Sequence, residues 1–298
     1  MSRIQNVAGT AFVAAECRAE ENLEDHPLYR DPIVHLFLDE ESKRAADRIF
    51  VSFPQWKASV RVRTRYVDDW LDRQLQIGFR QVVILGAGLD TRAQRKASSG
   101  VTYFEIDNGA TLAFKSARLQ ENGVDPGAVY ISGDYIADDL PTLLRRNGFD
   151  FSQPSHFIWE GNTAYLDASA VSLVLDCIAQ NVLRFSISFD YVAQELIANE
   201  TGDPETAAVV ARFAAMGAPW TYGVSDIGSL AGKIGAQVSD RFSIAELYRR
   251  YWPGKTPDSR IFDYYRICTL EGGRGDRSRM PSAEFGLNPS NDESSLVS

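Results

Sequence analysis

The segment from Gln81 to Arg95, QVVILGAGLDTRAQR, constrains the fold most strongly. It begins with a run rich in Val, Ile and Leu that ends at Gly86-Ala87-Gly88, and such a run predicts a strand buried on both faces of a parallel sheet. Glycine at 86 and 88 allows a sharp turn and a close approach of the backbone to a ligand. We expect a helix after this turn, capped by Asp90 or Thr91. A tight strand-to-helix turn without a ligand is the alternative.

Predicted strands and helices alternate along the rest of the chain. Further strands are expected at 101–107, 128–132, 155–159, 184–191, 236–239 and 263–270. Helices are expected between and after them, at 113–122, 140–146, 167–183, 207–216, 225–234 and 244–251. Alternation of this kind predicts parallel pairing through crossover connections, hence a doubly wound, Rossmann-like α/β sheet.

The chain divides into three predicted parts. Helical segments at 9–22, 31–37 and 55–76 predict that residues 1–80 form a helical cap at the edge of the sheet. Residues 81–272 are expected to form the core, with an insertion at about 192–225 whose Trp220 and Tyr222 could cover a substrate as a lid or pack in the core or a dimer contact. Residues 273–298 are rich in glycine, serine and charge without periodicity, which predicts a disordered tail.

Composition argues against several classes of protein. A formal net charge of -9 argues against non-specific binding to nucleic acid or to anionic membranes. No segment approaches the roughly 18 apolar residues of a membrane span, and the start of the chain lacks the apolar core of a signal peptide. We therefore expect a cytoplasmic protein. The scattered Cys17, Cys177 and Cys268 predict buried thiols rather than disulfides, and three histidines without paired spacing predict no metal site.

Glycines or acids stand at the ends of the first four predicted strands, at Gly86 and Gly88, Asp107, Asp134 and Glu160. The carboxyl ends of parallel strands meet at one edge of the sheet, where ligands bind. Gly86 and Asp107 are 21 residues apart, close to the roughly 20 that place a carboxylate against ribose hydroxyls. A single acid of this kind is usually a solvated strand end or a helix cap, but together they favour a nucleoside ligand.

The residues after the glycines distinguish between nucleoside cofactors. A dinucleotide site needs a third small residue, so that the helix N-terminus can hold pyrophosphate. Here Asp90 adds a negative charge and Thr91 occupies the place of the small residue. The segment therefore favours S-adenosylmethionine, which has ribose and adenine but no phosphate, over NAD(P).

Several segments together resemble the bacterial branch of the leucine carboxyl methyltransferase family, whose enzymes use S-adenosylmethionine. They are RVRTRYVDDWL, QVVILGAGLDTRAQR, FEID, GDY and WEGNTAYL, which follow in the family's order within about residues 10–270. The LGAGLDTR string is the most diagnostic of them. The resemblance implies a class I methyltransferase sheet with an antiparallel last strand, a helical N-terminal cap and an insertion after the fifth strand.

The same resemblance assigns cofactor-binding roles. It implies that Arg63, helped by Arg18, pairs with the cofactor's carboxylate, a group that a guanidinium grips in bidentate fashion. Arg61 and Arg65 on the same helix are as consistent with a surface position. The remaining implied contacts are Gly86, Ala87 and Gly88 beneath the methionine part, Asp107 at the ribose, Asp134 and the Tyr135 backbone at the adenine, and Glu160 and Tyr165 at the methionine end.

The reaction expected first is carboxyl O-methylation of a small molecule or peptide. A carboxylate is ionised at neutral pH and needs no general base, so proximity and orientation supply most of the rate, and the few histidines fit this. The alternatives are O-methylation of a hydroxyl, with Tyr165 or His156 as candidate bases, and a cofactor-binding protein without turnover. The acceptor and the oligomeric state are left open.

Two residues are candidates for the acceptor pocket, Tyr165 and Asn162. Family members tend to have apolar residues between the glutamate and the tyrosine of WEGNTAYL, whereas this chain has Asn162 and Thr163. This departure predicts an acceptor more polar than usual.

Overall fold

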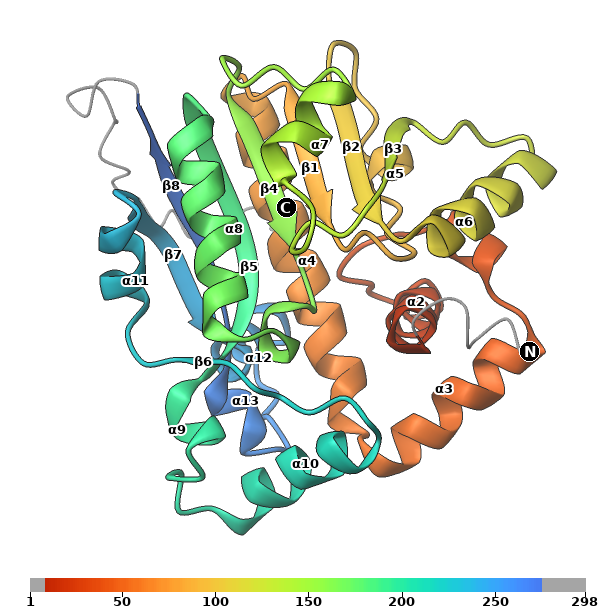
Figure 1. The fold of residues 1–298 in the computed structure, drawn as a ribbon. Helices are drawn as coiled ribbons and strands as arrows, with labels where there is room; N and C mark the ends of the chain where they lie inside the picture. The colour runs from red at the N-terminus through yellow and green to blue at the C-terminus, as the bar shows by residue number, and fades with distance from the viewer. Residues whose placement is uncertain (1–8, 275–298) are drawn as a thin grey trace, which may run out of the picture.

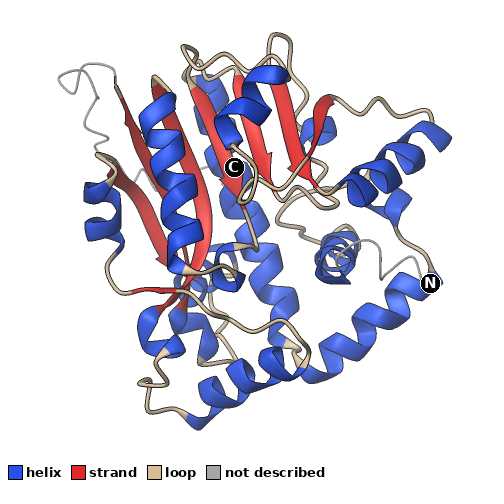
Figure 2. Ribbon diagram, viewed as in Figure 1, coloured by secondary structure: helices blue, strands red, loops and turns tan. Residues whose placement is uncertain are grey.

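The computed structural model describes residues 9–274, and its strands form one mixed sheet with helices on both faces (Figures 1 and 2). The strand order is β3-β2-β1-β4-β5-β8-β7, and β6 pairs with β5 beside this path. Strands β1 to β6 pair in parallel, whereas β8 runs antiparallel to both β5 and β7. The strands are β1 Gln81–Leu85, β2 Thr102–Asp107, β3 Ala128–Ser132, β4 Ser155–Trp159, β5 Arg184–Ala193, β6 Gly223–Val224, β7 Gln237–Ser243 and β8 Tyr265–Gly273. The predicted Rossmann-like sheet with an antiparallel last strand is thereby confirmed.

Strand β1 shows why the sheet lies in the middle of the molecule. All of its residues are buried, and successive side chains point to opposite faces. Val83 and Leu85 belong to the apolar cluster that includes α8, and Val82 and Ile84 to the cluster that includes α4. Full burial of each such side chain contributes about 1.5–3 kcal/mol. The continuous apolar run therefore follows from helices covering both faces.

The helices before β1 are α2 Gly9–Glu21, η1 Val34–Phe37, α3 Glu40–Ser52 and α4 Gln55–Gln76. Those of the core are α5 Arg92–Arg95, α6 Gly109–Glu121, α7 Leu140–Arg146, η2 Thr163–Tyr165 and α8 Ala168–Asn181. After β5 come α9 Gln194–Ile197, α10 Pro204–Ala215, α11 Ile227–Lys233, α12 Ile244–Tyr251 and α13 Ile261–Tyr264. Figure 1 shows α2, α3, α9 and α10 on the side of the sheet toward which the parallel strands point.

Two N-terminal elements differ from the prediction. The expected helix at 31–37 is only the 3-10 turn η1, and helix α3 was not predicted. Helix α3 buries Ser42, Ala46 and Phe50, a stripe too thin to stand out in its sequence. It begins with a capping box, in which Asp39 Oδ1 accepts from Ser42 N at 2.9 Å and Ser42 Oγ accepts from Asp39 N at 2.9 Å.

Salt bridges hold helix α2 against helix α4. Arg61 on α4 pairs with Glu20 at 3.6 Å, Glu21 at 3.2 Å and Glu24 at 2.8 Å, and Lys57 pairs with Glu20 at 2.7 Å. Arg61 is therefore a residue of the interface between these helices rather than of an open surface. Its pairing fixes α2 over the end of the sheet.

At the C-terminus, β8 continues to Gly273, beyond the strand end predicted at residue 270. Of the predicted disordered tail, 273–298, only residues 273 and 274 are described; the rest lies outside the described residues. Among residues 9–274 no helix has the length and apolar character that a membrane crossing requires. Cys17 and Cys268 are buried free thiols, as predicted, whereas Cys177 is partly exposed.

One charged pair is fully enclosed between β2 and α6. Glu105 and Lys115 are both 0 % exposed, and Lys115 Nζ donates to Glu105 Oε2. Burial raises the pKa of Glu105 to about 7, although Lys115 opposes this shift. Because the folded-state pKa lies above the ordinary value, this carboxyl favours the fold at low pH and opposes it as the pH rises from about 4.5 to about 7.

We expect Lys115→Met to lower the free energy of unfolding by about 3–5 kcal/mol at pH 8, because it leaves a buried carboxylate unpaired. The loss should shrink at pH 5, where Glu105 is protonated. Urea denaturation at both pH values measures it. The double variant Glu105→Met with Lys115→Met should recover most of the stability, and an equal loss at both pH values would contradict the assignment.

Candidate functional site

The turn after β1 requires glycine at both positions. Gly86 and Gly88 have φ angles of 63° and 52°, a region that disfavours residues with a Cβ. A Cβ on Gly86 would also lie 2.7 Å from Asn162 Oδ1, and one on Gly88 would lie 3.3 Å from Ala11 Cβ in α2. Asp107 Oδ2, at the end of β2, accepts from Gly88 N at 2.7 Å and holds the turn in place.

Asp90 and Thr91 act differently from the simple caps that the sequence predicted. The helix they begin, α5, is a single turn. Asp90 Oδ1 accepts from Arg92 N at 2.7 Å, as a cap does, but its other oxygen accepts from the Arg92 guanidinium. Thr91 makes no side-chain cap; its hydroxyl donates to Asp31 Oδ2 at 2.7 Å.

Asp90 is therefore not the free negative charge that the sequence argument assumed. Burial alone would raise its pKa, but Arg92, Arg18 and Lys115 together outweigh burial and hold the pKa of Asp90 below its ordinary value. The carboxylate stays ionised and its charge is matched by a buried guanidinium. The charge of Asp90 is therefore a weaker argument against pyrophosphate than the sequence suggested, whereas the second argument, Thr91 in the place of the small residue, is unaffected.

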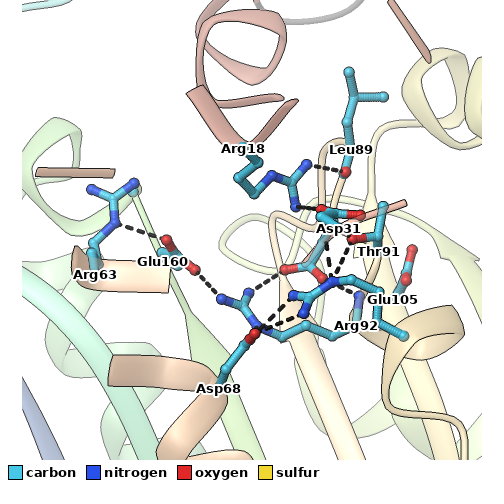
Figure 3. Close-up of polar contacts among 12 residues, drawn as sticks. Arg18, Asp31, Arg63, Asp68, Leu89, Thr91, Arg92, Glu105 and Glu160 are labelled. Atoms are coloured by element: carbon cyan, nitrogen blue, oxygen red, sulfur yellow. Dashed lines mark hydrogen bonds and ion pairs between the residues drawn. The ribbon is translucent and has the colours of Figure 1, made fainter. Parts of the chain in front are cut away.

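Arg63 on α4 reaches the end of the sheet, where Figure 3 shows it beside Glu160, and it contacts two further residues there. Its Nε donates to Glu160 Oε1 at 2.8 Å, and its Nη1 donates to Asp190 Oδ2 at 3.1 Å and to the hydroxyl of Tyr265. Glu160 Oε2 in turn lies 2.9 Å from Arg92 Nη2. Burial alone would raise the pKa of Glu160, but Arg92 and Arg63 hold it below its ordinary value. Two buried guanidinium groups thus share one carboxylate.

The charges continue from Arg92 toward α2. Asp68 on α4 pairs with Arg92 at 2.8 Å and with Arg95 at 2.7 Å. Asp31 Oδ2 then lies 3.7 Å from Arg95 Nε and 3.6 Å from Arg18 Nη1. Arg18 also donates to the carbonyl of Leu89 at 2.5 Å. This chain of charges, which we call the buried charge network, links α2, α4, the glycine turn and the ends of β4 and β5.

A cavity of about 410 Å³ lies at the carboxyl ends of β1 to β4. All the residues predicted to contact the cofactor, and the two acceptor-pocket candidates Asn162 and Tyr165, line it: Arg18, Arg63, Gly86, Ala87, Gly88, Asp107, Asp134, Tyr135, Glu160, Asn162 and Tyr165. The sequence therefore selected residues from six separate segments that the fold brings to one place.

Local contacts orient several of these residues. Asp134 Oδ1 accepts from Ile136 N at 2.9 Å and Ala137 N at 3.1 Å, so its carboxylate also closes the turn after β3. The Tyr135 hydroxyl accepts from Trp159 Nε1 at 3.1 Å. Asn162 Nδ2 donates to the carbonyl of Glu160 at 2.8 Å, which places Asn162 beside the glycine turn.

The other side of the cavity is aromatic, and most of it was not predicted. Phe53 and Trp56 from the α3–α4 corner, Phe213 from α10, Trp220 from the loop after it and Tyr265 from β8 line this side, which we call the aromatic wall. Only Trp220 had been singled out, because aromatic residues scattered over some 200 positions carry no local signal. Tyr222, predicted beside it, does not line the cavity and packs partly buried against the core.

His156 is not available as a base. It lies inside β4, is 0 % exposed and does not line the cavity. Burial lowers its pKa to about 3, so the imidazole is neutral. Its position in a strand that is buried throughout explains why it is enclosed.

Comparison with known proteins identifies the family. The model of the family described as leucine carboxyl methyltransferase matches residues 10–179. The chain belongs to this family. A relative from Mycobacterium marinum is 34 % identical over 227 residues, covering 68 % of this chain and 70 % of the relative, and one from Mycobacterium ulcerans is 33 % identical with the same coverage. Both are named "Putative S-adenosyl-L-methionine-dependent methyltransferase".

Solved structures agree on the fold. A crystal structure of a "putative methyltransferase" from Thermobifida fusca superposes with a TM-score of 0.57 at 17 % identity, covering 80 % of this chain and 92 % of that one. Together, family membership and fold confirm the predicted S-adenosylmethionine-dependent methyltransferase. They leave the methyl acceptor unspecified.

We expect Asp68→Asn to lower the free energy of unfolding by about 3–5 kcal/mol at pH 7, because Arg92 and Arg95 lose their shared carboxylate. Burial alone would raise the pKa of Asp68, but Arg95 and Arg92 hold it well below its ordinary 3.8. The stability that ionised Asp68 contributes is therefore present above about pH 4 and lost as the pH falls further. Between pH 5 and pH 2, the free energy of unfolding should fall less in the variant than in the wild type, as denaturation curves at both pH values would measure.

The matched control is Asp72→Asn on the same helix. Asp72 pairs with Lys96 at 2.6 Å but its side chain is 44 % exposed, and exposed pairs contribute about 0–1 kcal/mol. Equal losses in the two variants would show that the buried charge network does not stabilise the fold in this way.

Proposed function

We propose that this methyltransferase transfers a methyl group to a carboxylate of a small molecule. The observation that supports this most is the absence of a usable base among the described residues on the aromatic side of the cavity. The ionisable groups there are Tyr165 and Tyr265, and burial raises the pKa of both above the ordinary value. Deprotonated tyrosine is therefore disfavoured, and a hydroxyl acceptor would have no group to take its proton.

The acidic side chains of the cavity lie on the side opposite the aromatic wall, and each is already ion-paired or hydrogen-bonded. Glu160 is shared between two arginines, and Asp90 is paired with Arg92. Asp107 accepts from Gly88 N in the turn after β1, and Asp134 accepts from Ile136 N in the turn after its own strand, β3. A carboxylate acceptor, which arrives already ionised, needs none of these groups as a base.

The residues of the strand ends fit S-adenosylmethionine. The glycine turn leaves no side chain between the backbone and the cavity. Asp107 Oδ1 already accepts two bonds from Asn108, whereas Oδ2 accepts one from Gly88 N and can accept another from a ribose hydroxyl. Arg63 Nη2 has no hydrogen bond among the described residues, while Nε and Nη1 are held by Glu160, Asp190 and Tyr265. We infer that this nitrogen binds the cofactor's carboxylate, with Arg18 on the α2 side of the cavity.

S-adenosylmethionine, when bound, would supply a methyl group activated by its cationic sulfur. The acceptor oxygen would contribute the electron pair of the new C–O bond, and the C–S pair would remain on sulfur. No proton is transferred in such a step, and both charges disappear. The protein's part is to orient the acceptor and to exclude water. The reaction neutralises the acceptor's negative charge and the sulfur's positive charge, and this neutralisation is more favourable where water is excluded. The aromatic wall provides such surroundings.

We expect Asp107→Asn and Arg63→Gln each to weaken the binding of S-adenosylhomocysteine, measured by titration calorimetry, by about 10- to 100-fold. This corresponds to a lost hydrogen bond to a charged group, about 1.5–3 kcal/mol. Arg65→Gln is the control, since Arg65 lies on the same helix but pairs with Asp69 and does not line the cavity. Normal binding by both site variants would refute the proposed cofactor contacts.

The acceptor group is tested by the chemistry of the product. Transfer of a radiolabelled methyl group to a carboxylate gives an ester, and we expect the label to be released as methanol under mild base. A base-stable label would indicate an ether, hence a hydroxyl acceptor, and would overturn the proposal of carboxyl methylation.

A further inference from the structure

The aromatic wall is a set of rings in contact rather than separate side chains. Phe213 lies at its centre, with ring centroids 4.6 Å from Phe53, 5.1 Å from Trp56 and 4.5 Å from Trp220, on which it stacks. Trp220 lies 6.0 Å from Tyr265, at the boundary with the buried charge network. Val209, Ile261 and Phe262 complete this side without adding a charge.

The position of the wall is fixed by backbone contacts. The loop that carries Trp220 is bound to η2, because Thr221 N donates to the Ala164 carbonyl at 2.8 Å and Thr221 Oγ1 to the Leu166 carbonyl at 2.8 Å. On the outer side, Arg212 Nη1 donates to the Ser52 carbonyl at 3.0 Å and joins α10 to the α3–α4 corner. The rings are thus held in place around the cavity.

Charge is distributed unevenly around the cavity. Among the described residues that line it, the basic ones are Arg18 and Arg63, and the acids are Asp90, Asp107, Asp134 and Glu160. All of these belong to the strand-end side or to the buried charge network. An acceptor held against the aromatic wall therefore meets charge at one end only, where Tyr265 contacts Arg63 and Asp190.

The polar residues that predicted a more polar acceptor do not face the wall. Thr163 is buried and donates to the Asp190 carbonyl, and it does not line the cavity. Asn162 lies against the glycine turn. Gln55 and Ser59, close to Phe53 and Trp56 in the sequence, add uncharged polar groups to the cavity lining. The aromatic wall itself offers the body of the acceptor an apolar surface made of rings in contact.

We propose that the acceptor is a small aromatic monocarboxylic acid whose ring packs on Phe213 and Trp220. This inference rests on the proposed carboxyl methylation. Flat rings pack well on flat rings, and an aromatic pair contributes about 0.5–1.5 kcal/mol beyond its buried area. A second charge on the acceptor would lie among uncharged rings and be strongly disfavoured. The cavity of about 410 Å³ must also hold the cofactor, so we expect the acceptor to be small.

The test uses the full-length enzyme, radiolabelled S-adenosylmethionine and matched pairs of acids. Cinnamate is compared with 3-cyclohexylpropionate and benzoate with cyclohexanecarboxylate, so that each pair differs in aromaticity but hardly in size. Terephthalate adds a second charge, 2-naphthol replaces the carboxylate by a hydroxyl, and an acetylated dipeptide offers a peptide carboxylate. We expect kcat/KM for the aromatic monocarboxylates to exceed that of the saturated partners by about fivefold or more, as two ring contacts imply.

Two variants connect this preference to the wall. We expect Phe213→Leu and Trp220→Leu to reduce kcat/KM for the aromatic acid by about tenfold or more and that for its saturated partner much less. Their affinity for S-adenosylhomocysteine should stay within about twofold of the wild type, which shows that the fold and the cofactor side are intact. Tyr222→Leu is the matched control, because Tyr222 is on the same loop but outside the cavity.

The outcomes separate this inference from the proposed function. Equal or faster turnover of the saturated acids, of terephthalate or of the dipeptide would overturn the aromatic acceptor while leaving carboxyl methylation in place. A base-stable product from 2-naphthol, with no ester from any acid, would overturn carboxyl methylation. If no acid is methylated and calorimetry shows no binding of cinnamate to the enzyme loaded with S-adenosylhomocysteine, the aromatic acid is refuted.

Discussion

The pairing of Arg63 and Arg92 with Glu160 determines how the site is assembled. Each of these charges is largely removed from water, and a buried charge is tolerated only when it is paired and hydrogen-bonded. The arginines come from α4 and from the turn after β1, and the carboxylate comes from the end of β4. The three elements must therefore approach one another closely, and the cavity is the space left beside this contact. Its shape follows from the requirement to pair these charges.

The fold could be predicted largely because its signals are local. An apolar run that ends in glycines, and strands that end in acids, are properties of short segments, and the order of these segments determines a doubly wound sheet. Helix α3 was missed because only a few of its residues are buried, and η1 was predicted as a full helix because Pro32 and a short apolar stripe resemble a helix start. In both cases contacts with the rest of the cap decide the structure.

Site residues could be predicted from the sequence only where they belong to a recognisable motif. Gly86, Gly88, Asp107 and Glu160 stand at strand ends, and Arg63 belongs to a family motif, so each could be named from the sequence. The residues that orient these side chains could not be named from the sequence in the same way. Asp190 lies inside a strand that looks purely structural, and Tyr265 begins the last strand, so that only the folded chain reveals that both bind Arg63. The aromatic wall is a further example, since its rings come from three distant segments, around residues 53–56, 213–220 and 265.

The walls of the cavity come from nearly the whole length of the chain, from Thr10 in α2 to Tyr265 in β8. During synthesis the ribosome produces α2 first and β8 last, so a nascent chain lacks a complete cavity until the final strand has emerged. The proposed cofactor contacts lie between Arg18 and Tyr165, whereas the aromatic wall includes Tyr265. The acceptor side of the cavity is therefore the part that is completed last.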